Sequence, residues 1–389
     1  MAEIGYESLQ RLRSQFSEET LKQDLKREYM PFLEHSKRVY IWGTGLLGRF
    51  ACKQLIQSNI LEGGVIAYID NNRALAGSVV DDVPVITPDM IETNDLIIIC
   101  SQYFIEIEMQ VKNELSNPCL YYRILPFLYD EFGEWDIDKG LADSLKKLDI
   151  YRENYKNVFH KCADEVSKEI LDCILNYRFT MKSKWIQKAY EKTNESGNNI
   201  EYFDPEIIKP QKNEVFVDCG GYIGDTVLGF LKFVNNTYRK IYYFEPSKFI
   251  FNQAKENLKS IDNIVFTSAG VGETAGICKF VGAGQGDFGH IDDNGTETID
   301  IVRLDEIVID QPTFIKMDIE GAELSALKGA SGIIKESKPK LAICVYHKPE
   351  DLFEILELID SWGIHYKYYF RHYNKGLAGT ILYCIPQNE

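Results

Sequence analysis

Two segments of this chain join an apolar run to a glycine-rich turn and then to a helical pattern. The first turn, at residues 43–48, follows RVYIW, and the second, at residues 220–224, follows EVFVDC. A strand, a tight turn and a helix in that order form the repeating unit of a parallel sheet covered by helices. The feature therefore predicts an α/β protein with two Rossmann-like units.

The rest of the chain divides around these two units. Near-helical spacing of apolar residues predicts amphipathic helices at residues 1–37 and a charged helical connector at residues 131–200. The Rossmann-like units then occupy residues 38–130 and 201–389. The N-terminal or connector helices could join two copies of the chain into a homo-oligomer.

Within the first unit we predict strands at RVYIWG, GVIAYID and DLIIICS, with a turn-rich segment around Pro84 and Pro88. In the second unit, ICKFV and ETIDIVRL look like an inserted β-hairpin, and helices are expected at residues 247–259, 323–336 and 350–362. The glycine-rich segment between the hairpin strands could contact an acceptor through Gln285 or His290.

Composition excludes several classes of protein. With 43 basic and 59 acidic residues, the net charge of −16 gives the chain no general attraction to nucleic acid or to an anionic membrane. The start of the chain lacks the pattern of a signal peptide, and no window is apolar enough for a membrane span. Nine dispersed cysteines without a C-x-x-C pair indicate reduced thiols, so we predict a cytoplasmic protein without structural zinc.

The first glycine turn has the spacing of a dinucleotide-binding loop. Gly43, Gly45 and Gly48 form G-x-G-x-x-G, and Asp70 ends the next strand, where a carboxylate would accept ribose hydroxyls. IDNN and DDVPV resemble the N-terminal units of sugar-nucleotide epimerases, and the resemblance implies a nucleotide or nucleotide-sugar ligand. The alternative is a tight turn that binds nothing. A nicotinamide-dependent enzyme is disfavoured because no catalytic Y-x-x-x-K dyad follows.

The second glycine turn is acidic and carries no lysine at the start of its helix. It therefore fits a cationic ligand, such as the sulfonium and ammonium groups of S-adenosylmethionine, better than a phosphate. Asp218 ends the strand before the turn, and Glu245 ends the next strand, where it could bind both hydroxyls of a ribose. Asp218 alone could instead be a helix cap. The predicted cofactor-binding residues are Asp218, Gly220, Gly221, Gly224, Asp225, Thr226, Glu245 and Tyr202.

Four motifs, in order, resemble the FkbM family of S-adenosylmethionine-dependent methyltransferases: DCGGYIGDT, FEP, FIKMDIEGAE and CVYHKPED. The resemblance covers residues 213–389. It implies a seven-stranded class I methyltransferase fold, O-methylation and sugar-type acceptors. It also carries the family's cofactor positions onto Asp218, Gly220, Gly224 and Glu245 of this sequence.

Two further strand ends would face the same crevice. Asp318, Glu320 and Glu323 follow FIKM, and His347 follows LAICVY. His347 is suited to accept the proton of a hydroxyl, Asp318 could be the base, orient the acceptor or pair with His347, and Glu320 would support them. The alternatives are a structural histidine, or a divalent metal held by these three residues.

Two aromatic segments of the chain could also contribute to this crevice. Tyr202 and Phe203 precede the second unit and could cover the cofactor or the acceptor, or simply pack. RHYN at residues 371–374 could contact a phosphate or sugar, or pack. We predict an enzyme that methylates a sugar hydroxyl on a nucleotide-sugar or glycan. The alternative is a non-catalytic scaffold that binds nucleotide or cofactor and recruits glycan-assembly enzymes.

Overall fold

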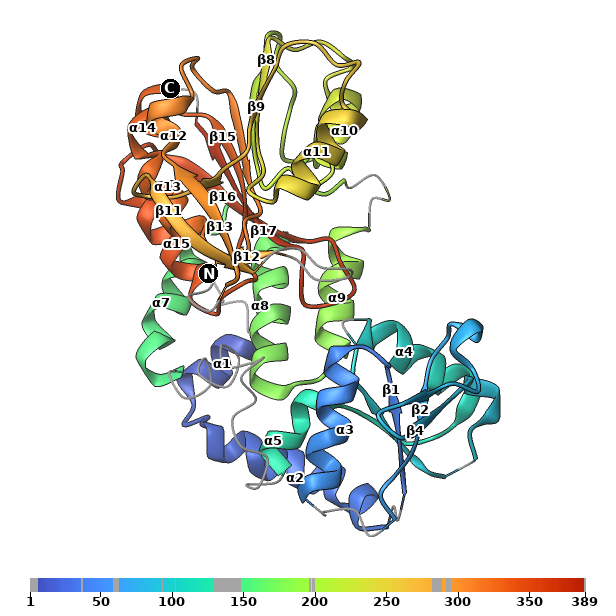
Figure 1. The fold of residues 1–389 in the computed structure, drawn as a ribbon. Helices are drawn as coiled ribbons and strands as arrows, with labels where there is room; N and C mark the ends of the chain where they lie inside the picture. Colours follow the sequence, from blue (N-terminus) through green and yellow to red (C-terminus); the bar gives the residue numbers. More distant parts are fainter. Residues whose placement is uncertain are drawn as a thin grey trace. The chain divides into compact units, whose positions relative to one another are not determined.

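The computed structural model describes residues 6–35, 38–58, 63–92, 94–101, 103–128, 148–195, 197, 200–281, 289–291 and 295–387. The chain forms two compact units, drawn as ribbons in Figure 1. The first contains residues 1–152, 172–188 and 375–377, and the second contains residues 153–171, 189–374 and 378–389. Both have a parallel or mostly parallel sheet, which confirms the predicted α/β class.

The described part of the first unit has a six-stranded sheet in the order β3-β4-β2-β1-β5-β6. Its strands are parallel except for β3. Their bounds are β1 Val39–Trp42, β2 Val65–Ile69, β3 Val79–Val80, β4 Val83–Ile86, β5 Leu96–Ile99 and β6 Cys119–Tyr121. β1, β2 and β5 are the three predicted strands.

The predicted turn-rich segment contains a turn at residues 81–82 and a helical turn at Pro88–Met90, but Pro84 itself lies inside β4, a strand that was not predicted. Its side chain is exposed, and the pairing of β4 with β2 runs through Val85 and Ile86 rather than through Pro84. A proline lacks the backbone N–H, so it is tolerated in a strand where the ladder does not need that donor.

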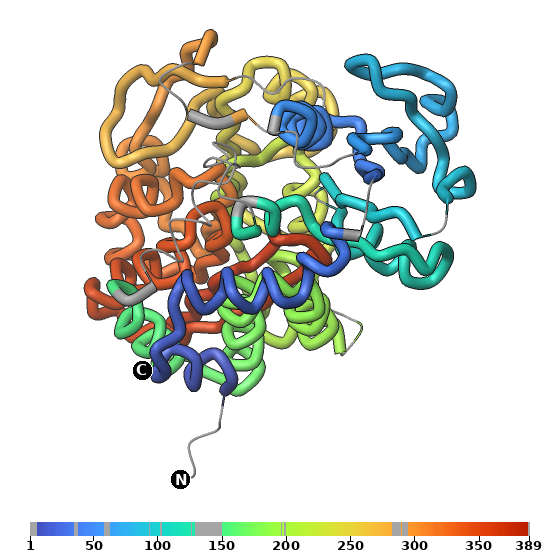
Figure 2. Tube along the Cα trace, turned by 90° about the horizontal axis from the view of Figure 1, so that it is seen from below, coloured from blue at the N-terminus to red at the C-terminus, as the bar shows by residue number. Residues whose placement is uncertain are grey.

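Helices surround this sheet and precede it. α2 lies against α5, as the blue and teal tubes of Figure 2 show. The helices of this part are α1 Glu7–Arg13, α2 Glu18–His35, α3 Leu46–Ser58, α4 Phe104–Gln110 and α5 Leu125–Leu128. Short helical turns lie between these elements, at η1 Arg73–Leu75, η2 Pro88–Met90, η3 Val111–Leu115 and η4 Tyr122–Ile124.

The described part of the predicted connector is helical. It contains α7 Leu148–Lys161, α8 Glu165–Thr180 and α9 Lys184–Thr193, while residues 131–147 lie outside the described residues. The first compact unit begins again at Asp172, in the middle of α8. None of the helices in the described part of the chain has both the length and the apolar character that a membrane span requires.

The second unit contains, in its described residues, a seven-stranded sheet in the order β16-β17-β15-β14-β7-β8-β9. The five strands from β15 to β9 are parallel, and β17 is antiparallel to both of its neighbours. The bounds are β7 Val215–Cys219, β8 Lys240–Phe244, β9 Ile264–Thr267, β14 Phe314–Met317, β15 Lys340–Cys344, β16 Tyr366–His372 and β17 Thr380–Pro386.

Helices cover both faces of this sheet. α10 and α11 lie on one side of it, and α13, α14 and α15 on the other (Figure 1). The core of the first side is aromatic: the ring of Phe216 on β7 stacks on that of Phe230 on α10 at 4.4 Å. The bounds are α10 Asp225–Phe233, α11 Lys248–Asn257, α12 Leu304–Ile307, α13 Glu323–Gly329, α14 Ser331–Ser337 and α15 Asp351–Asp360.

The single helix expected at residues 323–336 is wrong, because Ala330 separates α13 from α14. The break falls in the run Gly329-Ala-Ser-Gly332, and glycine is a weak helix former. A Cβ on Gly329 would lie 2.0 Å from the carbonyl oxygen of Gly272, so no larger residue fits at this position.

The predicted hairpin is present and belongs to a separate small sheet. β11 Gly276–Val281 pairs antiparallel with β13 Glu297–Val302. The described strands of this sheet have the order β10-β13-β11-β12, in which β10 is Gly270–Val271 and β12 is His290–Ile291. Gln285 lies outside the described residues.

Candidate active site

Four adjacent strands of the second unit bring the predicted functional residues to one edge of the sheet. Asp218 lies in β7, Glu245 follows β8, Asp318 follows β14 and His347 follows β15. These strands are parallel neighbours in the order β15-β14-β7-β8, so their carboxyl ends meet at one edge. From β7 the chain continues to β8 and β9 on one side of β7, and it later returns to β14 on the other side. Ligands of open α/β sheets bind at such a point, where the strand order reverses.

Asp218 is fully buried, and its burial raises the pKa of the carboxyl to about 6. Its Oδ1 lies 3.2 Å from Nζ of Lys316, a buried side chain on β14. Apart from this contact with Lys316, neither carboxylate oxygen has a hydrogen-bond partner among the residues that the structure describes. A buried carboxylate with unused acceptor oxygens requires an explanation, and a bound ligand supplies one.

Lys316 is a site residue that the sequence analysis missed. Its ammonium donates a hydrogen bond to the carbonyl oxygen of Gly220 at 2.6 Å, so it holds the glycine loop as well as Asp218. Burial opposes its charge, but Asp218 and Asp318 outweigh burial and raise the pKa of Lys316 above its usual range. The signal in the sequence is a lysine inside the apolar strand FIKM, where only a paired charge is stable.

Glu245 accepts hydrogen bonds from the backbone of the glycine loop and of the segment after β8. Its two carboxylate oxygens accept hydrogen bonds from the backbone N–H groups of Tyr222, at 3.2 Å, and Ser247, at 2.9 Å. Burial raises the pKa of Glu245 to about 7. An ionised carboxylate offers about four acceptor positions, so these two bonds leave room for ligand hydroxyls.

The glycines of this loop are required by the packing of the protein itself. Gly220 has a φ of +77°, and a Cβ there would lie 1.9 Å from the carbonyl oxygen of Asp318. A Cβ on Gly221 would lie 2.1 Å from the ring of Tyr243. Gly224, with a φ of +89°, precedes α10, whose first two residues are the exposed Asp225 and the half-buried Thr226.

Asp318 is held by two tyrosines. The hydroxyl of Tyr202 donates to Oδ2 at 2.9 Å, and that of Tyr346 donates to Oδ1 at 3.0 Å. Burial alone would raise the pKa of Asp318, but Lys316 and His347 hold it below its usual value. Tyr202 was expected to cover a ligand and Tyr346 was missed; both orient Asp318 in this structure.

His347 is surrounded by carboxylates. Its Nδ1 lies 3.1 Å from Oε1 of Glu323, and its Nε2 lies 3.5 Å from both Oδ1 of Asp318 and Oε2 of Glu320. Burial alone would lower the pKa of His347, but Glu323, Asp318 and Glu320 together raise it to about 9. The imidazole is therefore protonated at neutral pH, which the unperturbed value near 6.5 does not predict.

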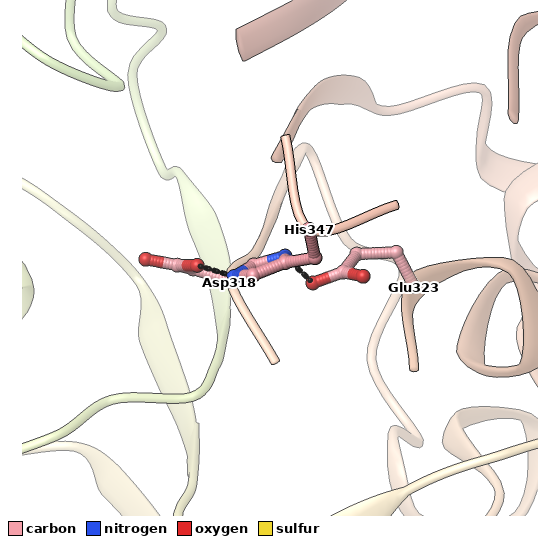
Figure 3. Close-up of side chains that lie close together, drawn as sticks. All are labelled: Asp318, Glu323 and His347. Carbon is pink, nitrogen blue, oxygen red and sulfur yellow. Dashed lines mark ion pairs between the residues drawn. The ribbon is translucent and has the colours of Figure 1, made fainter. Parts of the chain in front are cut away.

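Asp318, Glu323 and His347 place one ligand atom each within 4.8 Å of one another. A metal ion needs its ligand atoms to converge on one point. In Figure 3 the two carboxylates instead flank the imidazole on opposite sides, and each faces a different ring nitrogen. The predicted alternative set contained Glu320 in place of Glu323, and it stays a prediction.

In the first unit, Asp70 lies beside the glycine turn, at the end of the next strand, where the sequence spacing places it. Asp70 follows β2, and its Oδ2 accepts a hydrogen bond of 2.6 Å from the hydroxyl of Thr44 in the turn. A Cβ on Gly48 would lie 1.8 Å from the carbonyl oxygen of Gly43, so these two glycines serve the close turn. A Cβ on Gly45 would meet no described atom within 4 Å. Ligand binding here stays a prediction.

Two family models match the chain. Residues 218–366 match the methyltransferase FkbM domain, which contains every carboxylate of the site described above. The protein is a methyltransferase. Residues 35–118 match the C2185-like N-terminal domain, so the resemblance of this unit to sugar-nucleotide epimerases stays a prediction. No curated protein matches the chain.

One solved structure shares the fold of this methyltransferase over most of its length, and two others are similar to part of it. The crystal structure of methyltransferase FkbM from Methylobacillus flagellatus KT matches with a TM-score of 0.69 at 22% identity, over 93% of this chain and 100% of that chain. An rRNA methylase from Streptococcus thermophilus matches with a TM-score of 0.32 at 15% identity, over 47% of this chain and 91% of that chain. Aeropyrum pernix fibrillarin, solved with S-adenosyl-L-methionine bound, has a TM-score of 0.28 at 12% identity, over 45% of this chain and 67% of that chain.

Proposed function

We propose that this methyltransferase transfers the methyl group of S-adenosylmethionine to a sugar hydroxyl on a nucleotide-sugar or glycan. The observation that carries the proposal is the pair of buried carboxylates at the ends of β7 and β8. Asp218 has no partner among the described residues other than Lys316, and Glu245 has acceptor capacity left. Both lie within the FkbM domain match.

These residues fit the cofactor by its chemistry. A ribose presents two hydroxyl donors, which suit carboxylate acceptors, and the acidic loop suits a ligand with positive charge. When bound, S-adenosylmethionine supplies a methyl group activated by a sulfonium. Asp218, Glu245 and the loop from Gly220 to Thr226 would hold it at the switch point of the sheet.

The acceptor would meet the second pair of residues. Asp318, kept ionised by Lys316 and aimed by two tyrosine hydroxyls, would accept a hydrogen bond from the acceptor hydroxyl and orient it. Nε2 of His347, with Glu320 beside it, would take the proton. The charge of a cationic ligand in this crevice would lower the pKa of His347 and so make its neutral, basic form accessible.

The first unit would by itself bind a nucleotide or nucleotide-sugar. The support is the strand, glycine turn and helix at residues 39–58 with Asp70 hydrogen-bonded to the turn through Thr44. The start of α3 presents backbone N–H groups suited to phosphate, and the carboxylate of Asp70 is suited to ribose hydroxyls.

Calorimetric titration with S-adenosylmethionine tests the cofactor assignment. We expect the wild-type protein to bind, and the Asp218→Asn/Glu245→Gln double variant to lose at least about tenfold in affinity, because both acceptor groups lose their charge. The exposed pair Asp262→Asn/Glu354→Gln removes the same charges elsewhere and should bind as the wild type does. Absence of binding by the wild type, or full binding by the site variant, would contradict the proposal.

The acceptor class is tested by incubating the protein and labelled S-adenosylmethionine with extracts that contain nucleotide-sugars and glycans. Mass spectrometry should show a labelled methyl group on a sugar oxygen. Labelling of another class of molecule would replace the sugar acceptor. Cofactor binding without any transfer would favour the non-catalytic scaffold.

A further inference from the structure

One buried carboxylate of the site has no role in the reaction proposed above. Glu323 is the first residue of α13 and is fully buried. Its Oε1 accepts a hydrogen bond of 2.8 Å from the backbone N–H of Ile319 and lies 3.1 Å from Nδ1 of His347. Its Oε2 has no hydrogen-bond partner among the described residues. A fully buried carboxylate is unfavourable unless it faces a positive or donating group.

The backbone between Asp318 and Glu323 makes this position possible. Glu320 and Gly321 both have positive φ values, +55° and +89°, so the chain turns sharply between β14 and α13. Glu323 therefore comes back beside Ile319, four residues earlier, and its carboxylate is fixed there by the backbone. Asp318 comes to the other side of the imidazole (Figure 3), and Glu320 lies 3.5 Å from the same ring nitrogen, Nε2.

The two nitrogens of His347 consequently have different surroundings. Nδ1 faces Glu323, which is fully buried, whereas Nε2 faces the partly exposed Asp318 and Glu320. Neither nitrogen makes a well-aligned hydrogen bond with the described residues, although the side chain is only 9% exposed. Catalytic hydrogen bonds are often long or poorly aligned until the reactants bind.

We propose that Glu323 is a positioning residue that selects the tautomer of His347. The carboxylate keeps the proton of the neutral imidazole on Nδ1, so the lone pair of Nε2 faces the acceptor beside Asp318. The order carboxylate, imidazole, reacting hydroxyl is the logic by which a buried acid orients a catalytic histidine. This inference rests on the proposed role of His347 as the proton acceptor.

Other charged groups also face His347, so the effect of Glu323 has to be separated from theirs. They are Asp318 and Glu320 from the segment after β14, and Asp351 at the start of α15. Each acidic neighbour favours the protonated imidazole by its charge. Glu323 alone lies at ion-pair distance from Nδ1 among the described residues, so it alone should determine which nitrogen of the neutral ring carries the proton.

Nitrogen NMR of histidine-labelled full-length protein tests the proposal without cofactor or acceptor. The signal of His347 is assigned as the one of the six histidines that His347→Gln removes. In the wild type, above its pKa of about 9, we expect the neutral ring to be protonated on Nδ1, which is the less common tautomer of free histidine. A neutral wild-type ring protonated on Nε2 would overturn the proposal, and this observation needs no stable variant.

Two isosteric variants separate positioning from charge. Glu323→Gln keeps an acceptor for the Ile319 N–H; we expect it to lower the pKa of His347 by at least one unit and to lose the preference for Nδ1–H. Glu320→Gln should lower the pKa but keep the Nδ1–H tautomer. Equal tautomer ratios in the two variants would refute the positioning role.

The kinetic readout follows once an acceptor is known. Glu323→Gln should reduce kcat at high pH at least tenfold while the dissociation constant of S-adenosylmethionine stays unchanged. If the wild type does not bind S-adenosylmethionine, the proposed function is rejected, but the tautomer assignment is not. An unchanged kcat at high pH would reject the positioning role.

Discussion

At the scale of single residues, Lys316 connects the two halves of the site. Its ammonium lies 3.2 Å from Asp218, which we propose binds the cofactor, and its charge also holds down the pKa of Asp318, which we propose orients the acceptor. The ring of Tyr202, whose hydroxyl binds Asp318, lies 5.2 Å from the same ammonium. One buried cation thus stabilises the ionised form of two carboxylates with different proposed tasks.

We predict that Lys316→Met destabilises the protein by about 3–5 kcal/mol, because it leaves the buried Asp218 without its cation. The double variant Lys316→Met/Asp218→Asn should recover part of this loss, since the uncompensated charge is then absent. Urea unfolding of the two single variants and the double variant measures the coupling. A Lys316→Met protein as stable as the wild type would show that the ion pair contributes nothing to folding.

At the residue scale, the sequence predicts the candidate site residues themselves but not the side chains that contact them. Asp218, Glu245, Asp318 and His347 were predicted because each lies at the end of an apolar strand, which is a local pattern. The partners of these residues were harder to predict. Tyr202 reaches Asp318 across 116 positions of the chain. No local periodicity encodes such a contact.

At the scale of elements, a charged residue on β16 joins this strand to α8. The sequence left open whether this residue contacts a ligand or packs. Arg371 is buried on β16 and donates to Asp164, at 2.8 Å, and to Ser167, at 3.1 Å, at the start of α8. The backbone N–H of Phe370 donates to the same serine hydroxyl at 2.9 Å. The segment RHYN is therefore engaged in packing within the second unit.

We predict that Arg371→Lys costs about 1–3 kcal/mol of stability, because an ammonium cannot serve Asp164 and Ser167 together as the planar guanidinium does. The exposed Lys367→Gln on the same strand is the matched control and should change stability by less than about 0.5 kcal/mol. Thermal or urea unfolding measures both. Equal effects of the two substitutions would contradict this role of Arg371.

The elements that the sequence analysis missed are short or irregular. β3 and β6 have two and three residues, and β4 contains a proline, so none shows a clear alternation of apolar residues. The break between α13 and α14 was also missed, because a helical apolar pattern continues across it, whereas the close approach of Gly329 to the carbonyl oxygen of Gly272 is a tertiary contact.

At the scale of the whole molecule, several buried groups bind protons more tightly in the folded chain than in the unfolded chain. The pKa is raised by burial to about 6 at Asp218 and to about 7 at Glu201, Glu245 and Asp351. The carboxylates around His347 raise its pKa to about 9 despite burial. Unfolded carboxyl groups titrate near 4 and unfolded histidine near 6.5.

We therefore predict that the unfolding free energy falls as the pH rises from 5 to 9. Between the unfolded and folded pKa values the folded state binds more protons, so each unit of pH removes stability. Each such group contributes a loss of about 1.4 kcal/mol per pH unit over the interval between its unfolded and folded pKa values. Urea unfolding at several pH values measures it. Glu245→Gln should flatten the curve between pH 4.5 and 7, and a stability that rises toward pH 9 would contradict the prediction.

The sequence by itself determined the α/β class, the succession of most strands and turns along the methyltransferase unit, and the carboxylates at the strand ends. Apolar periodicity and turn chemistry are local, so they survive without knowledge of the fold. The tertiary structure alone decided that Lys316 pairs with Asp218, that two tyrosines aim Asp318, and that Glu323 faces the buried nitrogen of His347. Those contacts depend on strand order and backbone turns, which bring together residues far apart in the chain.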